Sequence, residues 1–415
     1  MIDNFSSQSE EYSKFRPTYP KKMYEWLVSN IECNDLAIDF ATGNGQNAVG
    51  LSEYFVNVIG IDISQVIYGT GVSNYTKGLV RHLLLNDKEN EYILFGSSLR
   101  RHKDLVKFIN SLDGKFESKI YRFPPLLLNF FWNVLHVVNI EILIGKVDIF
   151  HSSDWTQPPT KAKKVTTVHD LVPWKYPRFT HKNISSAHLA RLKWVAKEID
   201  RVIVPSRATE TDLLGLGFTK EKIRVIPEAA AEFYTVRGSG EIEEVKKKYA
   251  VNGNYLLIVG TSPRKNISKA IEAYFKSSAG KDLKLVIVGQ FNGQIKAERG
   301  IRVLGYVPDK DMPALYSGAA ALIYPSLYEG FGLTILEAFS CGCPVVTSNV
   351  SSMPEVAEGA AVLVDPTSVE SISEGISKAL AGRVGLIKKG LLKAQEYSWE
   401  KAAMETLSVY KELVK

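Results

Sequence analysis

The segment YPSLYEGFGLTILEAFSCGCPVV, from Tyr324 to Val346, decides the fold of this 415-residue chain. Its pattern predicts a strand that ends at Tyr324, a glycine-containing loop, and a helix that begins near Leu333. The unpaired backbone N–H groups in the first turn of such a helix point toward the loop, where they can hold a phosphate. The segment therefore predicts a strand, loop and helix unit that binds a phosphorylated ligand.

Two glycines and two glutamates in this segment have the chemistry of a ligand site. Gly330 and Gly332 allow the main chain to approach a ligand closely. Glu337, inside the helix, can accept hydrogen bonds from ribose hydroxyls, and Glu329 is placed to meet the hydroxyls of a second sugar. The spacing Glu329-x7-Glu337 alone equally fits two solvated side chains. The preceding strand and the Gly-Phe-Gly between the glutamates favour the ligand site.

Similar strand and helix units extend from this segment in both directions. The first half of the chain contains the apolar strands VIGIDIS, EYILFG, VDIFHSS, KVTTVHDL and RVIVPS, and the second half contains YLLIVG, LKLVIVG, IRVLGYV, AALIYPS, PVVTSN and AAVLVDP. Short apolar runs that alternate with helical segments predict parallel α/β sheets. A polar stretch over about residues 236–251 separates the two series and predicts a linker followed by a solvated helix.

Bulk composition bounds the class of protein. The formal net charge of +6 is mild, so it favours anionic partners without choosing among them. Cys33, Cys341 and Cys343 are too few for a disulfide framework and lack the ligand set of a zinc site, which predicts a reducing cytoplasm. The polar start of the chain lacks the features of a signal peptide. The most apolar stretch, residues 123–145, predicts an amphipathic helix packed in a core, with lipid contact as the alternative.

Several ordered motifs together resemble the retaining glycosyltransferases of family 4, which have the GT-B fold. The resemblance covers about residues 58–415 and implies an α/β protein with two Rossmann-like domains facing a cleft. It implies an N-terminal acceptor domain over residues 58–235 and a nucleotide-sugar donor domain over residues 236–395. A helix over residues 396–415 is expected to pack back on the N-terminal domain.

The resemblance also implies roles at the donor site. In that family the first glutamate of the motif faces the donor sugar and the second binds the donor ribose, which correspond to Glu329 and Glu337. The loop backbone that would contact the donor diphosphate runs through Phe331, Gly332, Leu333 and Thr334.

Two cations follow the first strand of the second domain, in VGTSPRKNISKAIEAY. Adjacent cations after a strand also fit a solvated turn, but the resemblance implies that Arg264 and Lys265 bind the diphosphate and offset its charge. Lys265 matches that role best. The chain departs from the family at Thr261, where many members have arginine, so Arg264 is the natural substitute. It departs again at Glu228-Ala229, where many members have asparagine-glycine.

Residues of the first domain are expected on the opposite side of the cleft. Gly69 and Gly71 precede a helix and resemble the glycine loop of the family near donor and acceptor. His169 and Asp170 follow a strand, at the end where open α/β sheets place their ligands. An isolated histidine is usually structural. The resemblance implies that His169 contacts the transferred sugar and that Asp170 orients it.

These assignments predict a metal-independent hexosyltransferase that retains the anomeric configuration. The resemblance implies that the leaving diphosphate oxygen takes the acceptor proton while the protein positions substrates and stabilises charge. We expect no metal and no cofactor, a nucleotide sugar as donor with GDP-mannose favoured, and a saccharide or lipid-linked saccharide acceptor in surface polysaccharide synthesis. No nucleic acid partner is expected. The predicted location is cytoplasmic, with peripheral contact at the inner face of the plasma membrane. The predicted catalytic residues are His169, Glu329, Lys265 and Arg264.

Residues 1–57 have a different character. AIDFATGNGQ has Asp39, Gly43 and Gly45 in the D-x-x-x-G-x-G spacing, and Asp62 ends the next strand. This pattern is typical of nucleoside-cofactor sites, but it fits NAD and S-adenosylmethionine equally. With the residues before it, this segment resembles the start of a class I methyltransferase that is truncated. We expect a partial α/β appendage that carries a vestigial S-adenosylmethionine motif.

VIGIDIS could be the second strand of the appendage or the first strand of the glycosyltransferase-like domain. We expect the latter, because that domain has a whole core to bury around it. Two alternative functions stay open at this point. One is a bifunctional or vestigial methyltransferase fusion, and the other is an inactive nucleotide-sugar-binding protein.

Overall fold

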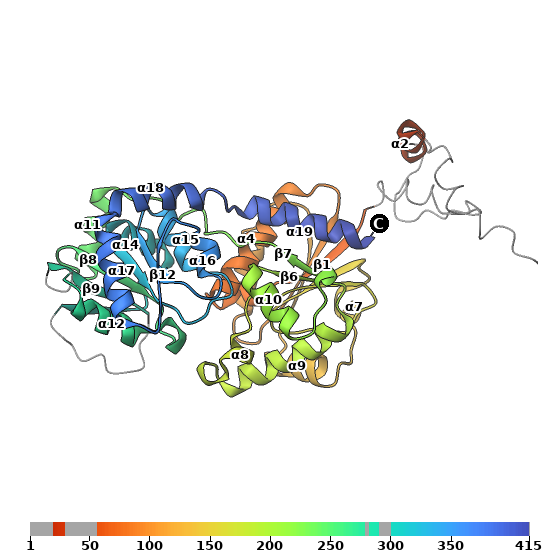
Figure 1. The fold of residues 1–415 in the computed structure, drawn as a ribbon. Helices are drawn as coiled ribbons and strands as arrows, with labels where there is room; N and C mark the ends of the chain where they lie inside the picture. Colours follow the sequence, from red (N-terminus) through yellow and green to blue (C-terminus); the bar gives the residue numbers. More distant parts are fainter. Residues whose placement is uncertain (1–19, 30–55, 279–281, 290–299, 415) are drawn as a thin grey trace, which may run out of the picture.

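The computed structural model describes residues 20–29, 56–278, 282–289 and 300–414, and the statements below refer to these residues. Two α/β domains lie side by side (Figure 1). Asp39, Gly43 and Gly45 lie outside the described residues. The short helix α2 (Lys21–Ser29) lies apart from both domains (Figure 1).

The N-terminal domain is built on a parallel sheet with the strand order β3-β2-β1-β4-β5-β6-β7. The strands are β1 (Val58–Asp62), β2 (Glu91–Ser97), β3 (Glu117–Tyr121), β4 (Ile149–Ser152), β5 (Lys163–Thr167), β6 (Arg201–Val204) and β7 (Ile223–Val225). The helical segments are η1 (Ser64–Ile67), α4 (Gly71–Asn86), α5 (His102–Ile109), α6 (Pro125–Leu128), the π-helical turn η2 (Asn129–Val134), α7 (Glu141–Ile144), α8 (Val172–Lys175), η3 (Pro177–Phe179), α9 (Lys182–Glu198), α10 (Arg207–Gly215) and η4 (Lys220–Lys222).

Strand β1, which contains VIGID, is a central strand of this sheet. It pairs in parallel with β2 on one edge and with β4 on the other, so that Gly60 lies opposite Ile93 and Phe150. Because a strand has only two hydrogen-bonding edges, no further strand can pair with β1 along this length. The prediction that VIGIDIS belongs to this domain is confirmed. Asp62, proposed as part of a vestigial cofactor motif, lies at the buried end of this strand.

The C-terminal domain has a second parallel sheet with the order β10-β9-β8-β11-β12-β13. Its strands are β8 (Tyr255–Val259), β9 (Lys284–Val288), β10 (Ile301–Gly305), β11 (Ala321–Tyr324), β12 (Val345–Ser348) and β13 (Val362–Val364). Its helical segments are α11 (Ser239–Lys248), η5 (Pro263–Lys265), α12 (Ile267–Lys276), η6 (Asp309–Asp311), α14 (Met312–Gly318), α15 (Leu333–Ser340), α16 (Met353–Ala357), α17 (Val369–Ala381) and α18 (Arg383–Ala394). Helix α11 has no buried residues, as a solvated helix after a linker should.

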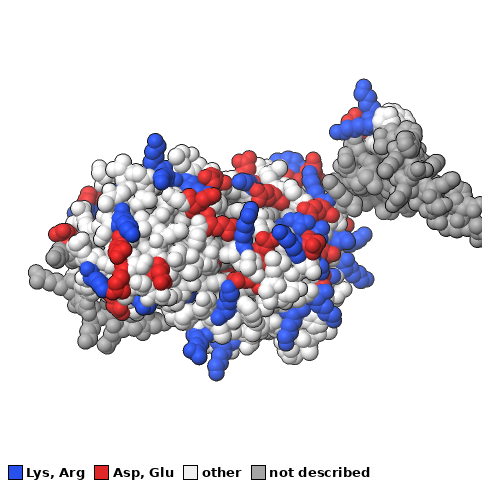
Figure 2. Space-filling view, viewed as in Figure 1, with Lys and Arg blue, Asp and Glu red and all other residues white. Residues whose placement is uncertain are grey.

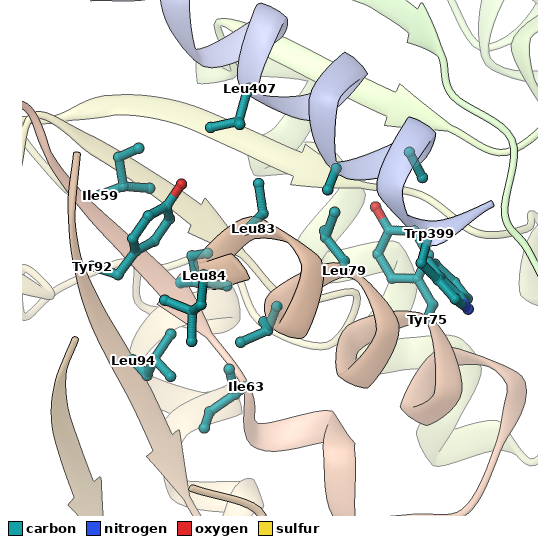
Figure 3. Close-up of a cluster of buried hydrophobic side chains, with 14 of the residues drawn as sticks. Ile59, Ile63, Tyr75, Leu79, Leu83, Leu84, Tyr92, Leu94, Trp399 and Leu407 are labelled. Atoms are coloured by element: carbon teal, nitrogen blue, oxygen red, sulfur yellow. The ribbon is translucent and has the colours of Figure 1, made fainter. Parts of the chain in front are cut away.

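The last helix, α19 (Trp399–Val414), crosses back to the N-terminal domain and packs against α4 (Figures 1 and 3). Trp399 and Leu407 join the buried cluster that α4 forms with the sheet. The contact is so close that a Cβ at Gly78 would lie 2.3 Å from the Trp399 ring. Burial of each such large side chain stabilises the fold by about 1.5–3 kcal/mol, so α19 ties the C-terminal end of the described residues to the N-terminal domain.

Three local expectations were incomplete or wrong. The short strands β3 and β7 were not predicted. Residues 123–145 do not form one amphipathic core helix, because α6, η2 and α7 are separate short elements there. Trp132 and Ile144 of this stretch are buried, whereas Leu126 and Ile142 are exposed. Several features of this stretch break the helix. Pro124 and Pro125 stand at its start, His136 and Val138 after η2 have positive φ values, and polar residues lie between the prolines and these two positions.

Candidate functional site

The loops that follow the strands of the two domains meet across the cleft. Gly69 has a φ of +66°, which suits a glycine, and Thr70 caps α4 by accepting a hydrogen bond from the Ser73 N–H. A Cβ at Gly71, the first residue of α4, would lie 3.8 Å from Leu333 at the start of α15. The glycine loop of the first domain therefore lies directly opposite the helix start of the second.

Glu329 is the centre of a buried charge cluster in the second domain. Its carboxylate forms ion pairs with Arg264 and with Lys265, and the Lys265 Nζ atom lies 2.7 Å from Oε1. The hydroxyls of Tyr324 and Ser326 donate to the same oxygen over 2.8 and 2.6 Å. The structure brings these three predicted residues together, although loops from two different strands carry them.

The charges of this cluster shift each other's pKa values. Burial alone would raise the pKa of Glu329, but the Lys265 and Arg264 charges and their hydrogen bonds lower it to about 2. Burial lowers the pKa of Lys265 to about 8, against the opposing attraction of Glu329. Glu329 is therefore a permanent anion near neutral pH, and its carboxylate holds the side chains of Arg264 and Lys265 in place.

Glu337 lies inside α15 and is separate from that cluster. Its Oε2 accepts a hydrogen bond of 2.9 Å from the Tyr316 hydroxyl. Burial raises the pKa of Glu337 to about 7, and hydrogen bonds from Tyr316 and Tyr234 oppose that shift only in part. The helix begins at Leu333, as expected, after Gly332 with a φ of +115°. The carboxyl group is thus poised to change charge in the neutral range.

The remaining residues of the loop are fixed by side chains beneath it. The Phe331 carbonyl accepts a hydrogen bond of 2.6 Å from the Ser352 hydroxyl, and the Glu329 carbonyl accepts from Ser351 and Ser352. Thr334 lies in the first turn of α15 near the Tyr324 hydroxyl. These contacts hold the loop before any ligand arrives, so its N–H groups need little rearrangement to bind one.

His169 and Asp170 lie where the N-terminal domain touches this loop. A Cβ at Gly330 would lie 1.8 Å from the His169 carbonyl oxygen, so only glycine fits there. The Gly330 carbonyl accepts hydrogen bonds from the hydroxyls of Ser206 and Thr209, at the start of α10. The two domains are therefore in direct contact beside the predicted catalytic residues.

Each of these two residues has its own partner. The Nδ1–H of His169 donates to Glu228 over 2.8 Å, and Tyr75 packs edge-on against the imidazole ring. The Asp170 carboxylate accepts from the Val172 N–H over 2.9 Å, which fixes the start of α8. Glu228 was not among the predicted site residues. The only sequence signal for it was its place where the family usually has asparagine.

A cavity of about 530 Å³ opens beside these residues on the N-terminal side of the cleft. Arg264 lines it from the other domain, and the aromatic side chains Tyr68, Trp155 and Phe179 line its apolar part. The carboxylates of Asp154 and Asp170 also line it. Aromatic faces combined with hydrogen-bond acceptors suit a sugar, which presents both C–H faces and hydroxyls.

Asp154 is held by two buried side chains, Arg191 and His188, that sequence reasoning missed. Arg191 Nη1 lies 3.0 Å from one carboxylate oxygen and His188 Nε2 lies 3.1 Å from the other. Burial would raise the pKa of Asp154, yet the charges of His188 and Arg191 lower it. Neither side chain stands in a recognisable motif, because the residues come from α9 and from the loop after β4.

Within residues 20–29, 56–278, 282–289 and 300–414, no group of three or more His, Cys, Asp or Glu side chains is arranged to hold a metal ion. None of the helices in those ranges is both long and apolar enough to span a bilayer. Cys341 and Cys343 are buried free thiols.

Comparison with protein families gives two matches that follow one another along the chain. Residues 69–229 match the model for Glycosyltransferase Family 4, and residues 241–397 match that for Glycosyl transferases group 1. Neither match includes residues 1–57, so the methyltransferase resemblance of that segment gains no support.

Individual relatives and solved structures agree with this. The O-antigen chain mannosyltransferase B of Escherichia coli is 30% identical over 82% of this chain and 96% of its own length. The O-antigen chain mannosyltransferase RfbU of Salmonella typhimurium is 28% identical over 62% of this chain and 72% of its own. Among solved structures, sucrose-phosphate synthase of Thermosynechococcus elongatus superimposes with a TM-score of 0.65 at 18% identity, covering 86% of this chain and 99% of that one. HepE of Anabaena, solved with UDP and glucose, gives a TM-score of 0.62 at 15% identity, covering 86% and 99%. The fold is that of the GT-B glycosyltransferases.

Proposed function

The chain belongs to the glycosyltransferases of group 1 and family 4, and from that premise we propose that it transfers mannose with retention from GDP-mannose to a saccharide acceptor. The observation that carries this proposal is the pairing of Glu329 with Arg264, which lines the cavity, and with Lys265, together with Glu337 one turn inside the following helix. This arrangement offers cations to a diphosphate and carboxylates to two sugars.

Arg264 and Lys265 act on the leaving group in this proposal. When the bond between the sugar C1 and the phosphate oxygen breaks, negative charge develops on the diphosphate, and nearby fixed cations stabilise it. The backbone N–H groups from Phe331 to Thr334 supply further donors at the start of α15. The family resemblance also implies diphosphate binding at these groups. Glu329 holds the two cations and Ser352 holds the loop, which supports a site formed before the donor binds.

The proton balance follows from retention. The acceptor hydroxyl approaches on the face that the nucleotide leaves, a bond forms between its oxygen and C1, and the departing phosphate oxygen takes its proton. The Glu329 carboxylate stabilises the positive charge that develops on the sugar, His169 contacts the sugar and fixes its orientation, and Asp170 orients the site. Glu337 accepts hydrogen bonds from the ribose hydroxyls. No side chain needs to act as a nucleophile in this scheme.

The acceptor is proposed to occupy the 530 Å³ cavity on the N-terminal side. Tyr68 and Trp155 can stack on a sugar ring, and Asp154 can accept hydrogen bonds from its hydroxyls. The mannose donor is proposed from the relatives, two of which are named O-antigen chain mannosyltransferases. A saccharide of a surface polysaccharide, carried on a lipid, is the acceptor class that fits both observations.

The test is thermal melting of the purified chain with GDP, UDP and ADP sugars. A ligand that binds the folded state raises the melting temperature by mass action. We expect a rise with GDP-mannose that is lost in Glu337→Ala. Product analysis by NMR then shows whether the new linkage keeps the α configuration. If the melting temperature rises with a different nucleotide sugar, that sugar is the donor and GDP-mannose is not. If GDP-mannose binds but no saccharide is glycosylated, the chain is an inactive binding protein.

A further inference from the structure

A fully buried arginine holds one of the carboxylates that line the 530 Å³ cavity. The Lys and Arg side chains seen on one face of the molecule project from its surface, where they are interspersed with Asp and Glu (Figure 2). Arg191 of α9, by contrast, is 0% exposed. Burial of a guanidinium is costly unless its charge is paired and its N–H groups are hydrogen-bonded. The partners of Arg191 therefore show what its burial achieves.

Arg191 joins two segments of the N-terminal domain. Its Nη1–H donates to Asp154, in the loop after β4, over 3.0 Å. Its Nη2–H donates to the Thr167 carbonyl over 3.1 Å and to the Thr166 hydroxyl, at the end of β5. Thr167 stands two residues before His169. One planar guanidinium therefore ties a carboxylate at the cavity to the segment that carries His169.

The carboxylate of Asp154 is held through both of its oxygens. His188 Nε2 lies 3.1 Å from the oxygen that Arg191 does not bind. Since His188 and Arg191 are three positions apart on α9, they lie on the same face of that helix. Burial would raise the pKa of Asp154, but the charges of His188 and Arg191 lower it. An ionised carboxylate has more acceptor positions than these two contacts use, so Asp154 can still accept hydrogen bonds from ligand hydroxyls.

Stability alone does not account for this buried ion pair. The Asp154 side chain is 12% exposed and that of Arg191 is 0% exposed. When two charges are buried together, their lost hydration offsets most of their attraction, and apolar side chains of similar volume often give an equally stable fold. A guanidinium provides what an apolar side chain cannot, which is a fixed geometry of several hydrogen bonds. That geometry matters here because Asp154 and His188 line the cavity.

We propose that Arg191 is a positioning residue that fixes Asp154 relative to His169, so that a saccharide bound by Asp154 presents its hydroxyl to the donor sugar. A displacement of about 1 Å at a reacting group can slow a reaction on the order of 100-fold, which explains why a buried cation is retained at this place. The identity of the ligand as the acceptor saccharide rests on the proposed function. The link between Asp154 and the segment of His169 rests on the contacts of Arg191 alone.

The experiment measures saccharide binding and nucleotide binding separately. Methyl glycosides of mannose, glucose, galactose and N-acetylglucosamine are titrated by NMR into the full chain with GDP present, and the tightest ligand of the unchanged chain is the probe. GDP itself is titrated by calorimetry. Arg191→Met should weaken binding of the probe by about ten-fold or more, as expected when a hydrogen bond to a charged group is lost. Its affinity for GDP should not change. Arg191→Lys keeps the charge without the planar fork, so its affinity for the probe should be intermediate.

A double variant separates positioning from a merely structural role. If Arg191 acts only through Asp154, the combination Asp154→Asn, Arg191→Met should bind the probe no more weakly than Asp154→Asn alone. The combination also removes both buried charges, so its melting temperature should stay close to that of the unchanged chain. A structural role would instead lower probe binding, GDP binding and melting temperature together.

Arg201→Met is the matched control. Arg201 begins β6, at the end of the sheet opposite to the cleft, and pairs with Glu412 over 3.0 Å. This variant should bind the probe as the unchanged chain does.

Three outcomes would overturn the proposal. In the first, no glycoside of the panel binds the unchanged chain although GDP does. In the second, Arg191→Met binds the probe as tightly as the unchanged chain. In the third, the double variant loses GDP binding or melts at a much lower temperature. Failure of the proposed function is a different result, because GDP-mannose would then neither bind nor be turned over while the probe still distinguished the variants.

Discussion

The carboxylate of Glu228 accepts a hydrogen bond of 2.8 Å from Nδ1–H of His169, and both side chains are buried at the cleft. This bond fixes the ring, so that its other nitrogen is left for a ligand. Burial opposes the charged imidazolium, but Glu228, Asp154 and Asp170 outweigh that effect and raise the pKa of His169.

Replacement of this partner should change the pH dependence of the reaction. In Glu228→Gln the imidazolium loses its closest negative charge, so the pKa of His169 falls and the charged form is lost at a lower pH. Because Tyr75, His151, Asp154 and Asp170, the other titratable groups near the ring, are unchanged, the shift reports on Glu228. We expect kcat/KM near pH 8 to drop about ten-fold, a difference of about 1.4 kcal/mol.

The measurement for Glu228→Gln is kcat/KM against pH, in which the alkaline limb should move to lower pH. Glu232→Gln, which removes an exposed carboxylate that contacts His82, is the matched control. A uniform loss of activity with no displacement of that limb would mean that Glu228 is only structural.

The pairing of Glu329 with two cations predicts a stability effect that a ligand reverses. Glu329→Gln leaves Arg264 and Lys265 without their buried counter-charge, which should lower the free energy of unfolding by up to about 3 kcal/mol. A nucleoside diphosphate can supply the missing negative charge. GDP should therefore stabilise the variant more than it stabilises the unchanged chain.

Urea denaturation with and without GDP checks this, and Glu358→Gln is a control because that exposed glutamate is paired with Lys393, which keeps a second partner in Glu396. An equal effect of GDP on both proteins would contradict a diphosphate site at these cations.

The raised pKa of Glu337 predicts that donor binding depends on pH. Below about pH 7 the buried carboxyl group is protonated and loses strength as an acceptor for ribose hydroxyls. The KM for the donor should therefore rise as pH falls from 7.5 to 6, by roughly the ten-fold per pH unit that a single titration allows. In Glu337→Gln the KM should be high at all pH values and flat. A wild-type KM that is equally flat would remove Glu337 from the ribose site.

The same pKa has a consequence for the free protein. The folded-state value of about 7 lies above the ordinary 4.5, so the group favours folding below pH 4.5, and this contribution is lost as pH rises through 7. Glu337→Gln should therefore raise the melting temperature of the ligand-free chain at pH 8 and change it little at pH 5. A lower melting temperature of the variant at pH 8 would show that its hydrogen bonds with Tyr316 matter more than the buried charge.

The close contact at Gly330 predicts that adding one methyl group there would push the two domains apart. In Gly330→Ala the new carbon would overlap the His169 carbonyl, at 1.8 Å, and the adjacent Asp170 side chain. Each domain keeps its own core, so we expect folding to be retained while kcat falls at least 100-fold, about 2.7 kcal/mol. Small-angle scattering should report a more open molecule. Gly215→Ala, where nothing lies within 4 Å, is the control, and normal activity in Gly330→Ala would argue against a closed catalytic form.

The features predicted correctly from sequence are those that short-range patterns encode. Strands β1, β8 and β11 are continuous apolar runs because they are buried on both faces, and the glycines before α15 mark its start. Strand β3 was missed because it is an edge strand with the polar sequence ESKIY, and its side chains are at most half-buried. An edge strand needs no apolar pattern, so the sequence pattern of its residues does not predict it.

Long-range pairs explain the missed site residues. The contact between Glu228 and His169 joins positions 59 residues apart, and that between Arg191 and Asp154 joins positions 37 apart. No local spacing encodes such partners, since they meet only when the sheet order is complete. By contrast, Arg264 and Lys265 were predicted from the family resemblance, in which basic residues at the turn after this strand bind the donor diphosphate. The exposure of Leu126 could not be predicted either, because an apolar run has the same sequence pattern whether it faces a core or solvent.

The position of β1 predicts that the residues before it are dispensable for the glycosyltransferase unit, which we propose to be residues 58–415. Both edges of β1 are occupied by β2 and β4, and α19 covers α4 on its outer side. The Asn57 carbonyl accepts from the Glu91 N–H, so a shortened chain should begin at residue 56 to keep that bond. We expect this chain to match the full-length protein in melting temperature and in its response to GDP-mannose, and S-adenosylmethionine to shift neither. A melting temperature several degrees lower in the shortened chain, or a rise with S-adenosylmethionine in the full chain, would give the N-terminal segment a role in folding or cofactor binding.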